Sequence, residues 1–355
     1  MRNCPQGSSG KRLPVFSPGE TPQPPSSDAV YLEMNRMAGA YPFVYLSEYG
    51  RSVLGRPLLY ICAGSGQRKV WYNASHHANE WITTNVLLKF MDELFSKSRT
   101  GGNIAGFDAA ALLRENRLCF MPLVNPDGVD LVLGKLGQSE VAEARRIARA
   151  YPSIPFPSGW KANLQGIDLN LQYPANWEKA REIKFAQGFV SPAPRDYVGP
   201  APLAAAESNA LAAFTKAGSP DVTLSLHTQG EVIYWRFADF APPGARELGE
   251  KLAAASGYTL SETPPVSDNA GYKDWFIQDF RRPGYTIEVG EGKNPLPVSE
   301  KFSIRQLTIE YMDAVCRQYH LFDEPEYIAE RLKAGVIFGA FCGKEMAGFI
   351  GEHAE

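Results

Sequence analysis

Hydrophobic and polar residues follow two patterns along this chain: short apolar runs, and longer stretches in which apolar residues recur every three or four positions. The short runs predict buried β-strands, and the longer stretches predict amphipathic helices. The predicted strands span 58–63, 70–74, 117–123, 222–226 and 285–289. The predicted helices span 81–90, 139–150, 204–217, 245–255, 272–280 and 300–319, with a further helical pattern from Tyr31 onward.

Strands and helices alternate over most of the chain. This order predicts an α/β fold in a single domain, whose central twisted sheet is mixed, mainly parallel, largely buried and flanked by helices. Of the 355 residues, 44% are hydrophobic, which is enough for a sizeable core. We therefore expect one large domain with appendages instead of two equal halves.

The two ends of the chain depart from this alternation. Residues 1–28 are rich in Pro, Gly and Ser, and we expect a disordered tail there, because such a segment cannot bury enough apolar surface. The predicted domain covers 29–320. Residues 321–355 predict a short helix and a hairpin with its turn near Gly343. This extension either adds to the main sheet or begins a second domain that the chain does not complete.

One junction between a predicted strand and a predicted helix carries candidate chemistry. His77 and Glu80 stand three residues apart in the stretch KVWYNASHHANEWITTNVLLKF at 69–90, so both lie on one face of a first helical turn. An imidazole and a carboxylate can fill two of the three protein positions on a catalytic zinc ion. The same spacing also occurs in solvated pairs at helix starts, so a third ligand is needed to distinguish a metal site from such a pair.

Four further histidines are candidates for the third ligand: His76, His227, His320 and His353. His227 ends a predicted strand in LSLHTQGEVIYW, and ligands bind at the carboxyl ends of strands in open α/β sheets. The alternative for His227 is a histidine that bonds to a backbone carbonyl. His76 points elsewhere on the same turn as its neighbour, and the last two histidines are expected on the surface.

Glu288 is a second unusual polar residue. It lies between Ile287 and Val289 in the predicted strand of GYTIEVGEG. A charge in an apolar strand is costly unless it has a partner or a task. A zinc hydrolase needs a general base beside its water, so Glu288 is the candidate base.

Net charge and apolar runs narrow the range of partners. The formal net charge is −3, with no basic run that would favour nucleic acid or a membrane surface. We therefore expect a peptide or other small-molecule substrate. The N-terminus lacks the apolar segment of a signal peptide, and no apolar stretch approaches the roughly 18 residues of a membrane span, so a cytoplasmic location is expected.

The five cysteines suggest neither a disulfide framework nor a thiolate zinc site, because their number is odd and no C-x-x-C spacing occurs. Cys62 and Cys119 lie in apolar runs that resemble strands. We expect both to be small buried hydrophobic residues.

Five motifs make a family resemblance specific. They are HANEWIT at 77–83, NPDG at 125–128, GIDLN at 166–170, SLHTQGE at 225–231 and TIEVG at 286–290. In order and rough spacing they resemble the zinc carboxypeptidase family of metallopeptidases, over about Tyr31 to His320. Within that family the chain looks most like the bacterial γ-D-glutamyl-L-diamino acid endopeptidases, which cut peptidoglycan stem peptides. The resemblance implies a zinc-carboxypeptidase-like fold.

The resemblance also implies roles for individual residues. His77, Glu80 and His227 would bind one zinc ion, and Glu288 would be the catalytic base. Asp168 matches the carboxylate that orients the first histidine and raises its basicity.

The residues that would contact the substrate depart from the family pattern at two positions. Asn170 matches a residue that holds the substrate carboxylate. True carboxypeptidases follow that asparagine with an arginine that clamps the terminal carboxylate, whereas this chain has Leu171. The family's oxyanion-stabilising arginine corresponds best to Lys161, which would supply the charge without the planar fork of a guanidinium.

Two more positions bear on substrate binding. The family's mobile active-site tyrosine falls near Val266, and Tyr272 is a candidate substitute that would contact the substrate. Lys273 falls where carboxypeptidases place the residue at the base of the pocket for the leaving group. A cation there suits a leaving group with an extra carboxylate, such as diaminopimelate.

We therefore predict a zinc-dependent peptidase that hydrolyses the γ-D-glutamyl bond to meso-diaminopimelate, or to a related diamino acid, in peptidoglycan peptides. Two alternatives remain open. A conventional zinc carboxypeptidase acting on ordinary peptides shares the metal chemistry but predicts an arginine at Leu171. A non-catalytic protein that binds cell-wall peptides would usually have lost a ligand or the base, and this sequence has lost neither.

Overall fold

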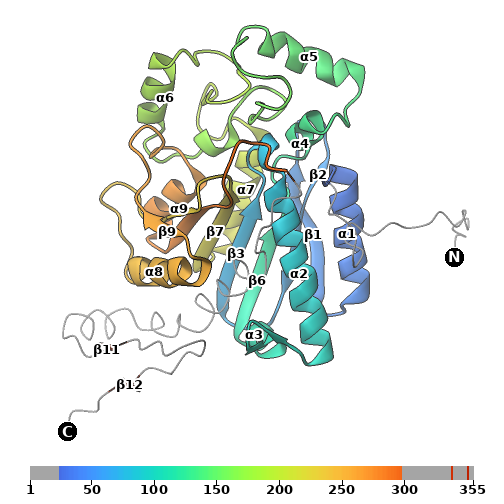
Figure 1. Cartoon of the computed structure of the whole chain (residues 1–355), viewed down its shortest axis with the longest axis vertical. Helices are drawn as coiled ribbons and strands as arrows, with labels where there is room; N and C mark the ends of the chain where they lie inside the picture. Colours follow the sequence, from blue (N-terminus) through green and yellow to red (C-terminus); the bar gives the residue numbers. More distant parts are fainter. Residues whose placement is uncertain (1–23, 298–336, 339–349, 352–355) are drawn as a thin grey trace, which may run out of the picture.

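The computed structural model describes residues 24–297, together with 337–338 and 350–351 (Figure 1). Its centre is an eight-stranded sheet with the strand order β1-β2-β6-β3-β7-β10-β8-β9. The strands are β1 (Val44–Arg51), β2 (Pro57–Ala63), β3 (Arg68–Ala74), β6 (Asn116–Met121), β7 (Val222–His227), β8 (Val232–Tyr234), β9 (Thr259–Ser261) and β10 (Gly284–Glu288).

The centre of this sheet is parallel, and its β1 edge is antiparallel. Strand β3 pairs in parallel with β6 and β7, β7 pairs in parallel with β10, and β8 pairs in parallel with β9. The pairs β1–β2, β2–β6 and β8–β10 are antiparallel. The predicted α/β fold with a mixed, mainly parallel sheet is confirmed.

Helices cover both faces of the sheet. The larger core lies between one face and α1 (Ser27–Ala40), α2 (Ile82–Thr100), α3 (Ala109–Glu115) and α8 (Ala245–Ser256). The second core packs α7 (Ala206–Gly218) and α9 (Tyr272–Phe280) against the other face. Along β3, Val70 and Tyr72 belong to the first core, and Trp71 belongs to the second. This alternation is the two-residue period of a strand that is buried on both faces.

Irregular chain and short helices lie across the upper end of the sheet in Figure 1. They include η1 (Ala78–Glu80), α4 (Pro126–Val132), α5 (Gln138–Ala148), η2 (Leu169–Leu171) and α6 (Trp177–Ala186). Elsewhere in the chain, β4 (Asn103–Ile104) and β5 (Phe107–Asp108) form a small separate sheet. An NPDG sequence is typical of a turn, but here α4 begins at Pro126. The Asn125 side chain accepts a hydrogen bond from the Gly128 backbone N–H, and Pro126 occupies the first helical turn, both of which favour a helix start.

The folded region begins earlier than predicted, because α1 starts at Ser27, inside the stretch assigned to the tail. The backbone N–H and the hydroxyl of Ser27 both donate to the Asp130 carboxylate, at 2.9 and 2.6 Å. The helix predicted at 300–319 and the short helix predicted at the start of 321–355 lie outside the described residues. Strands β11 (Ile337–Phe338) and β12 (Ile350–Gly351) pair antiparallel. The chain between them is not described.

The expectation for the cysteines is wrong at one pair, because Cys62 and Cys119 form a disulfide. The two residues are directly opposite on the antiparallel strands β2 and β6, with their Cα atoms 4.1 Å apart. Directly opposite residues of antiparallel strands bring their side chains together. The sequence did not reveal this register, because the two cysteines are 57 residues apart.

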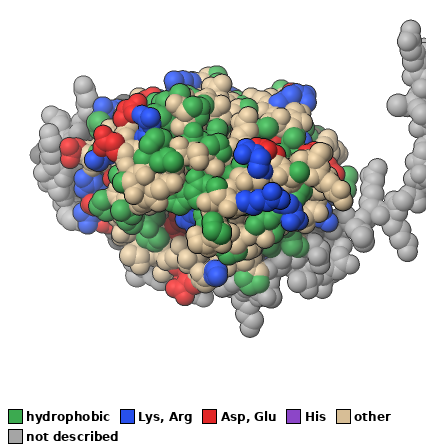
Figure 2. Space-filling model, turned by 90° about the horizontal axis from the view of Figure 1, so that it is seen from above, with side chains coloured by type: hydrophobic (Ala, Val, Ile, Leu, Met, Phe, Trp, Pro, Cys, Tyr) green, Lys and Arg blue, Asp and Glu red, His purple; other side chains and the backbone are tan. Residues whose placement is uncertain are grey.

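The face seen in Figure 2 mixes basic, acidic and apolar side chains, and no histidine of the described chain is visible on it. His76 and His227 are buried, at 0% and 1% exposure. Among the described helices, none is long and apolar enough to cross a membrane.

Candidate metal centre

Three predicted ligands meet at the carboxyl ends of two neighbouring strands. His77 follows β3, Glu80 ends η1 and His227 ends β7, which pairs in parallel with β3. The polypeptide turns away from the sheet directly after β3, and η1 brings Glu80 back beside His77. Their ligand atoms all lie within 4.8 Å of one another.

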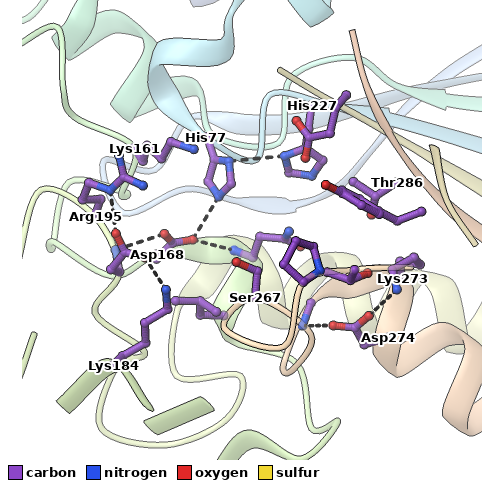
Figure 3. Close-up of a pocket in the computed structure, with 18 residues that line it drawn as sticks. His77, Lys161, Asp168, Lys184, Arg195, His227, Ser267, Lys273, Asp274 and Thr286 are labelled. Atoms are coloured by element: carbon purple, nitrogen blue, oxygen red, sulfur yellow. Dashed lines mark hydrogen bonds and ion pairs between the residues drawn. The ribbon is translucent and has the colours of Figure 1, made fainter. Parts of the chain in front are cut away.

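The distances between these atoms fit one bound metal ion. Nδ1 of His77 lies 2.9 Å from a Glu80 carboxylate oxygen, and Nδ1 of His227 lies 3.1 Å from the other. The two Nδ1 atoms face each other at 3.2 Å, as the dashed line in Figure 3 shows. Ligand atoms about 2.1 Å from a tetrahedral zinc ion are roughly 3.4 Å apart. Two imidazoles and one carboxylate that converge in this way suit Zn²⁺ and leave an open position.

Carboxylates on both sides of His77 favour a positive charge there. Nε2 of His77 lies 3.1 Å from an Asp168 carboxylate oxygen, on the side opposite Glu80. Burial lowers the pKa of His77, but Glu80 and Asp168 outweigh this effect and raise the pKa to about 9. Burial also disfavours the charged form of Glu80, yet His77 and Lys161 hold the Glu80 pKa well below its usual range. This negative environment would equally stabilise a metal cation.

The other histidine on this turn is not part of the cluster. His76 is buried, and its Nε2 lies 3.0 Å from the Tyr173 hydroxyl oxygen, so it faces the second core. His320 and His353 lie outside the described residues. The geometry therefore brings together the three residues that the sequence selected and leaves His76 out.

Glu288 stands next to the metal cluster, because β10 pairs with β7 and places Glu288 directly beside His227. Burial raises the pKa of Glu288 to about 8, and the nearby Glu80 carboxylate adds to this effect. Among the described residues, the Glu288 carboxylate has no hydrogen bond or ion pair. A carboxylate with a raised pKa beside a metal position can take a proton from water.

Lys161 extends into the same cluster from the irregular region after α5. Its Nζ atom lies 2.9 Å from the Glu80 carboxylate, and 17% of its side chain is exposed. Burial alone would lower the pKa of Lys161, but Glu80 raises it above the usual value, so the ammonium stays charged. The charge therefore lies beside the metal position, where the resemblance places an oxyanion-stabilising group.

The cluster opens into a pocket of about 200 Å³. Its lining is strongly charged, with four basic and four acidic side chains besides the two histidine ligands. The basic ones are Lys161, Lys184, Arg195 and Lys273, and the acidic ones are Asp168, Asp196, Asp274 and Glu288. Such a lining favours a polar ligand with several charges over an apolar one.

Two residues predicted to contact the substrate line this pocket. Asn170 lines it near the metal cluster, and its side-chain oxygen accepts a hydrogen bond from the Tyr272 backbone N–H. Lys273 lies across the pocket from Lys161 and Arg195 (Figure 3), where its Nζ lies 2.6 Å from the Asp274 carboxylate and donates to the Arg236 carbonyl. Leu171, which replaces the arginine clamp, also lines the pocket.

Tyr272 does not line the pocket, and its role as a substitute for the mobile tyrosine stays a prediction. Its side chain is fully buried in the second core, where the hydroxyl forms a 2.9 Å hydrogen bond with Thr215. The ring packs edge-on against Tyr173. Contact with a substrate would require this ring to leave the core.

The sequence did not single out several pocket residues. Arg195 and Asp196 come from a proline-rich connection between α6 and α7, Lys184 comes from α6, and Tyr234 ends β8. An adjacent arginine and aspartate within PAPRDY is a charged pair in an otherwise uncharged segment. That pair was the one available signal.

Comparisons with known proteins agree with this geometry. Residues 30–314 match the family model described as zinc carboxypeptidase. The chain is 41% identical over 274 residues to γ-D-glutamyl-L-diamino acid endopeptidase 1 of Lysinibacillus sphaericus, a match that covers 77% of this chain and 67% of that protein. It is also 41% identical over 276 residues to the uncharacterised protein YqgT of Bacillus subtilis strain 168, covering 77% and 72%.

The fold has a solved counterpart as well. The structure of carboxypeptidase A from Helicoverpa armigera superposes with a TM-score of 0.60 at 18% identity, covering 82% of this chain and 71% of that one. The family resemblance predicted from the five motifs is therefore confirmed.

Proposed function

The chain belongs to the zinc carboxypeptidase family of metallopeptidases, and we propose that it hydrolyses the γ-D-glutamyl bond to meso-diaminopimelate, or to a related diamino acid, in peptidoglycan peptides. The observation that carries this proposal is the convergence of His77, Glu80 and His227 beside Glu288, in the lining of a strongly charged pocket. The similarity to an endopeptidase named for this bond supports the choice of substrate.

One zinc ion per chain would be held by Nδ1 of His77, Nδ1 of His227 and the Glu80 carboxylate. When bound, zinc supplies a Lewis acid that polarises the scissile carbonyl and lowers the pKa of a water molecule. Asp168 accepts a hydrogen bond from Nε2–H of His77, which fixes the tautomer and leaves Nδ1 free to bind the metal.

Glu288 is the proposed base. It takes a proton from the attacking water and later delivers a proton to the departing amine, so it needs a pKa near the working pH. Its burial beside Glu80 raises the pKa in that direction. The Lys161 ammonium would stabilise the negative charge that develops on the carbonyl oxygen.

The pocket favours this substrate over an ordinary peptide end. The position of the usual arginine clamp holds Leu171, which cannot bind a terminal carboxylate. Lys273 offers a cation at the far side of the pocket, where a second carboxylate on the leaving group would lie. Meso-diaminopimelate has such a carboxylate on its side chain, whereas lysine does not.

Purified protein loaded with zinc should be given two peptides side by side, and the products separated by liquid chromatography. The first is L-Ala-γ-D-Glu-meso-diaminopimelate, and the second is an ordinary peptide with an aliphatic C-terminal residue. We expect release of free diaminopimelate from the first and little cleavage of the second. Efficient cleavage of the second peptide alone would identify a conventional carboxypeptidase and overturn the proposal.

A further inference from the structure

The positive charges of the pocket fall into two groups. Lys161, Lys184 and Arg195 lie on one side of His77, and Lys273 lies on the other side with Asp274 (Figure 3). A ligand that spans the metal position therefore meets a cation at each end. This arrangement suits a substrate with carboxylates on both sides of the bond to be cut.

Three of these four cations are already paired through their charged ends. Lys161 lies 2.9 Å from Glu80, Lys184 lies 2.6 Å from Asp196, and Lys273 lies 2.6 Å from Asp274. Each lysine ammonium has three N–H donors, so a ligand carboxylate would share the group with the acidic partner that already contacts it.

Arg195 differs, because it uses only one edge of its guanidinium. Its Nε atom lies 2.5 Å from Asp196, and within the described chain its two terminal nitrogens have no partner. About 42% of the side chain is exposed, and it lines the pocket. Two parallel N–H groups of this kind match the two oxygens of a carboxylate.

The free edge of Arg195 is held in place by a chain of contacts that begins at the metal cluster. Asp168 binds His77 with one oxygen and accepts the Asp196 backbone N–H with the other, at 3.1 Å in both cases. The Asp196 carboxylate then holds both Arg195 and Lys184. These contacts fix the position of Arg195 relative to the metal cluster.

The side of the pocket decides which substrate carboxylate Arg195 would meet. Lys273 occupies the side assigned to the leaving group, so Arg195 lies on the acyl side with Lys161. In a γ-linked glutamyl residue the α-carboxylate stays free, and three carbon atoms separate it from the scissile carbonyl carbon. In an α-linked peptide that carboxylate is consumed by the peptide bond.

We propose that Arg195 binds the free α-carboxylate of the γ-linked glutamyl residue and thereby selects γ-linked over α-linked substrates. This role rests on the proposed function and adds a residue that distinguishes γ-linked from α-linked glutamyl residues. The arginine clamp lost at Leu171 is then not simply missing, because a guanidinium from another loop serves a carboxylate on the other side of the scissile bond.

The test compares two substrates that differ by one charge. The first is L-Ala-γ-D-Glu-meso-diaminopimelate, and the second is its D-isoglutaminyl analogue, in which a carboxamide of the same shape replaces the α-carboxylate. We expect wild-type protein to prefer the acid by about 10- to 100-fold in kcat/KM, mainly through KM. Arg195→Gln should reduce kcat/KM on the acid to the level of the amide and leave the amide nearly unchanged.

Arg146→Gln is the matched control. Arg146 also pairs with an acidic residue through its Nε atom, at 2.8 Å from Glu143, but it lies on α5 and does not line the pocket. This variant should keep the full preference for the acid. Zinc content and melting temperature of both variants should match those of the wild type.

Three results would overturn the role of Arg195. The first is an acid preference that survives in Arg195→Gln, and the second is an equal loss on both substrates. The third is a preference that changes only when the leaving group is amidated, which would place Arg195 on the leaving-group side. Wild-type protein that cleaves neither peptide would instead overturn the proposed function, and this role with it.

Discussion

The site has two parts that are built differently. The metal part consists of His77, Glu80, His227 and Glu288, which stand at the carboxyl ends of three neighbouring parallel strands or directly after them. The substrate part comes from irregular chain between α5 and α7 and from the segment that leads into α9. Strands that are buried on both faces fix the first part, whereas loops provide the second. A scaffold of this kind can keep its chemistry while its loops change the substrate.

The two parts also differ in how their charges are satisfied. In the metal part, Glu80 contacts both histidines, so its groups converge on one position. In the substrate part, basic side chains pair with acidic side chains of the pocket lining, as in Arg195 with Asp196 and Lys273 with Asp274. Substitutions in the first part should therefore affect every substrate, and substitutions in the second should affect the choice among substrates.

The largest effect is expected from removal of a metal ligand. Glu80→Ala or His227→Ala should lose most of the bound zinc and all detectable cleavage of every peptide, because two remaining ligands bind zinc poorly. Elemental analysis measures the zinc, and circular dichroism checks that the fold persists. Full zinc retention in either variant would refute that ligand.

A smaller but still large effect is expected at the base. Glu288→Gln should keep stoichiometric zinc and lose about 10³-fold in kcat, since an amide cannot accept the proton. Glu291→Gln is the control, because Glu291 is exposed three residues further on and lies outside the pocket. Near-normal turnover in the zinc-loaded Glu288→Gln protein would show that Glu288 is not the base.

Lys161 lies where the two parts meet, so its substitution tests the division between them. Lys161→Met should lower kcat by roughly 10- to 100-fold on acid and amide substrates alike, because it removes a charge beside the developing oxyanion. Lys161→Arg should restore part of the rate. A change in the acid preference instead of the rate would assign Lys161 to the substrate part.

The smallest effect concerns stability of the metal-free protein. The pKa of Glu288 is about 8 in the folded state, above the ordinary value of 4.5. A carboxyl group whose pKa rises on folding contributes stability below its unfolded pKa and loses it as the pH increases through the folded pKa. Glu288→Gln removes this loss. The melting temperature of the variant should therefore rise relative to that of the wild type as the pH increases from 5 to 8. A constant difference over that range would contradict the raised pKa.

The metal part was predictable from sequence because strand ends fix where its residues point. Once the runs ending at Ala74, Leu226 and Val289 were identified as strands, the nearby polar residues His77, His227 and Glu288 were expected at one edge of the sheet. The five family motifs then made the assignment specific. The structure brings these residues together as expected.

The substrate part was only partly predictable, because its residues depend on long-range contacts. Arg195 reaches the pocket through Asp196 and Asp168, a link that no local pattern encodes. For Tyr272, the start of α9 was predicted, but the side of the helix that faces the core was not. The Cys62–Cys119 disulfide likewise depended on strand register.

The central claim is that the metal part holds one zinc ion that this peptidase needs to cut a γ-D-glutamyl bond. The most direct measurement is a titration of chelator-treated wild-type protein with zinc, followed by release of diaminopimelate from L-Ala-γ-D-Glu-meso-diaminopimelate. We predict that the rate rises from near zero to a plateau at one zinc per chain. Full activity in the metal-free protein, or no cleavage at full zinc occupancy, would contradict the account.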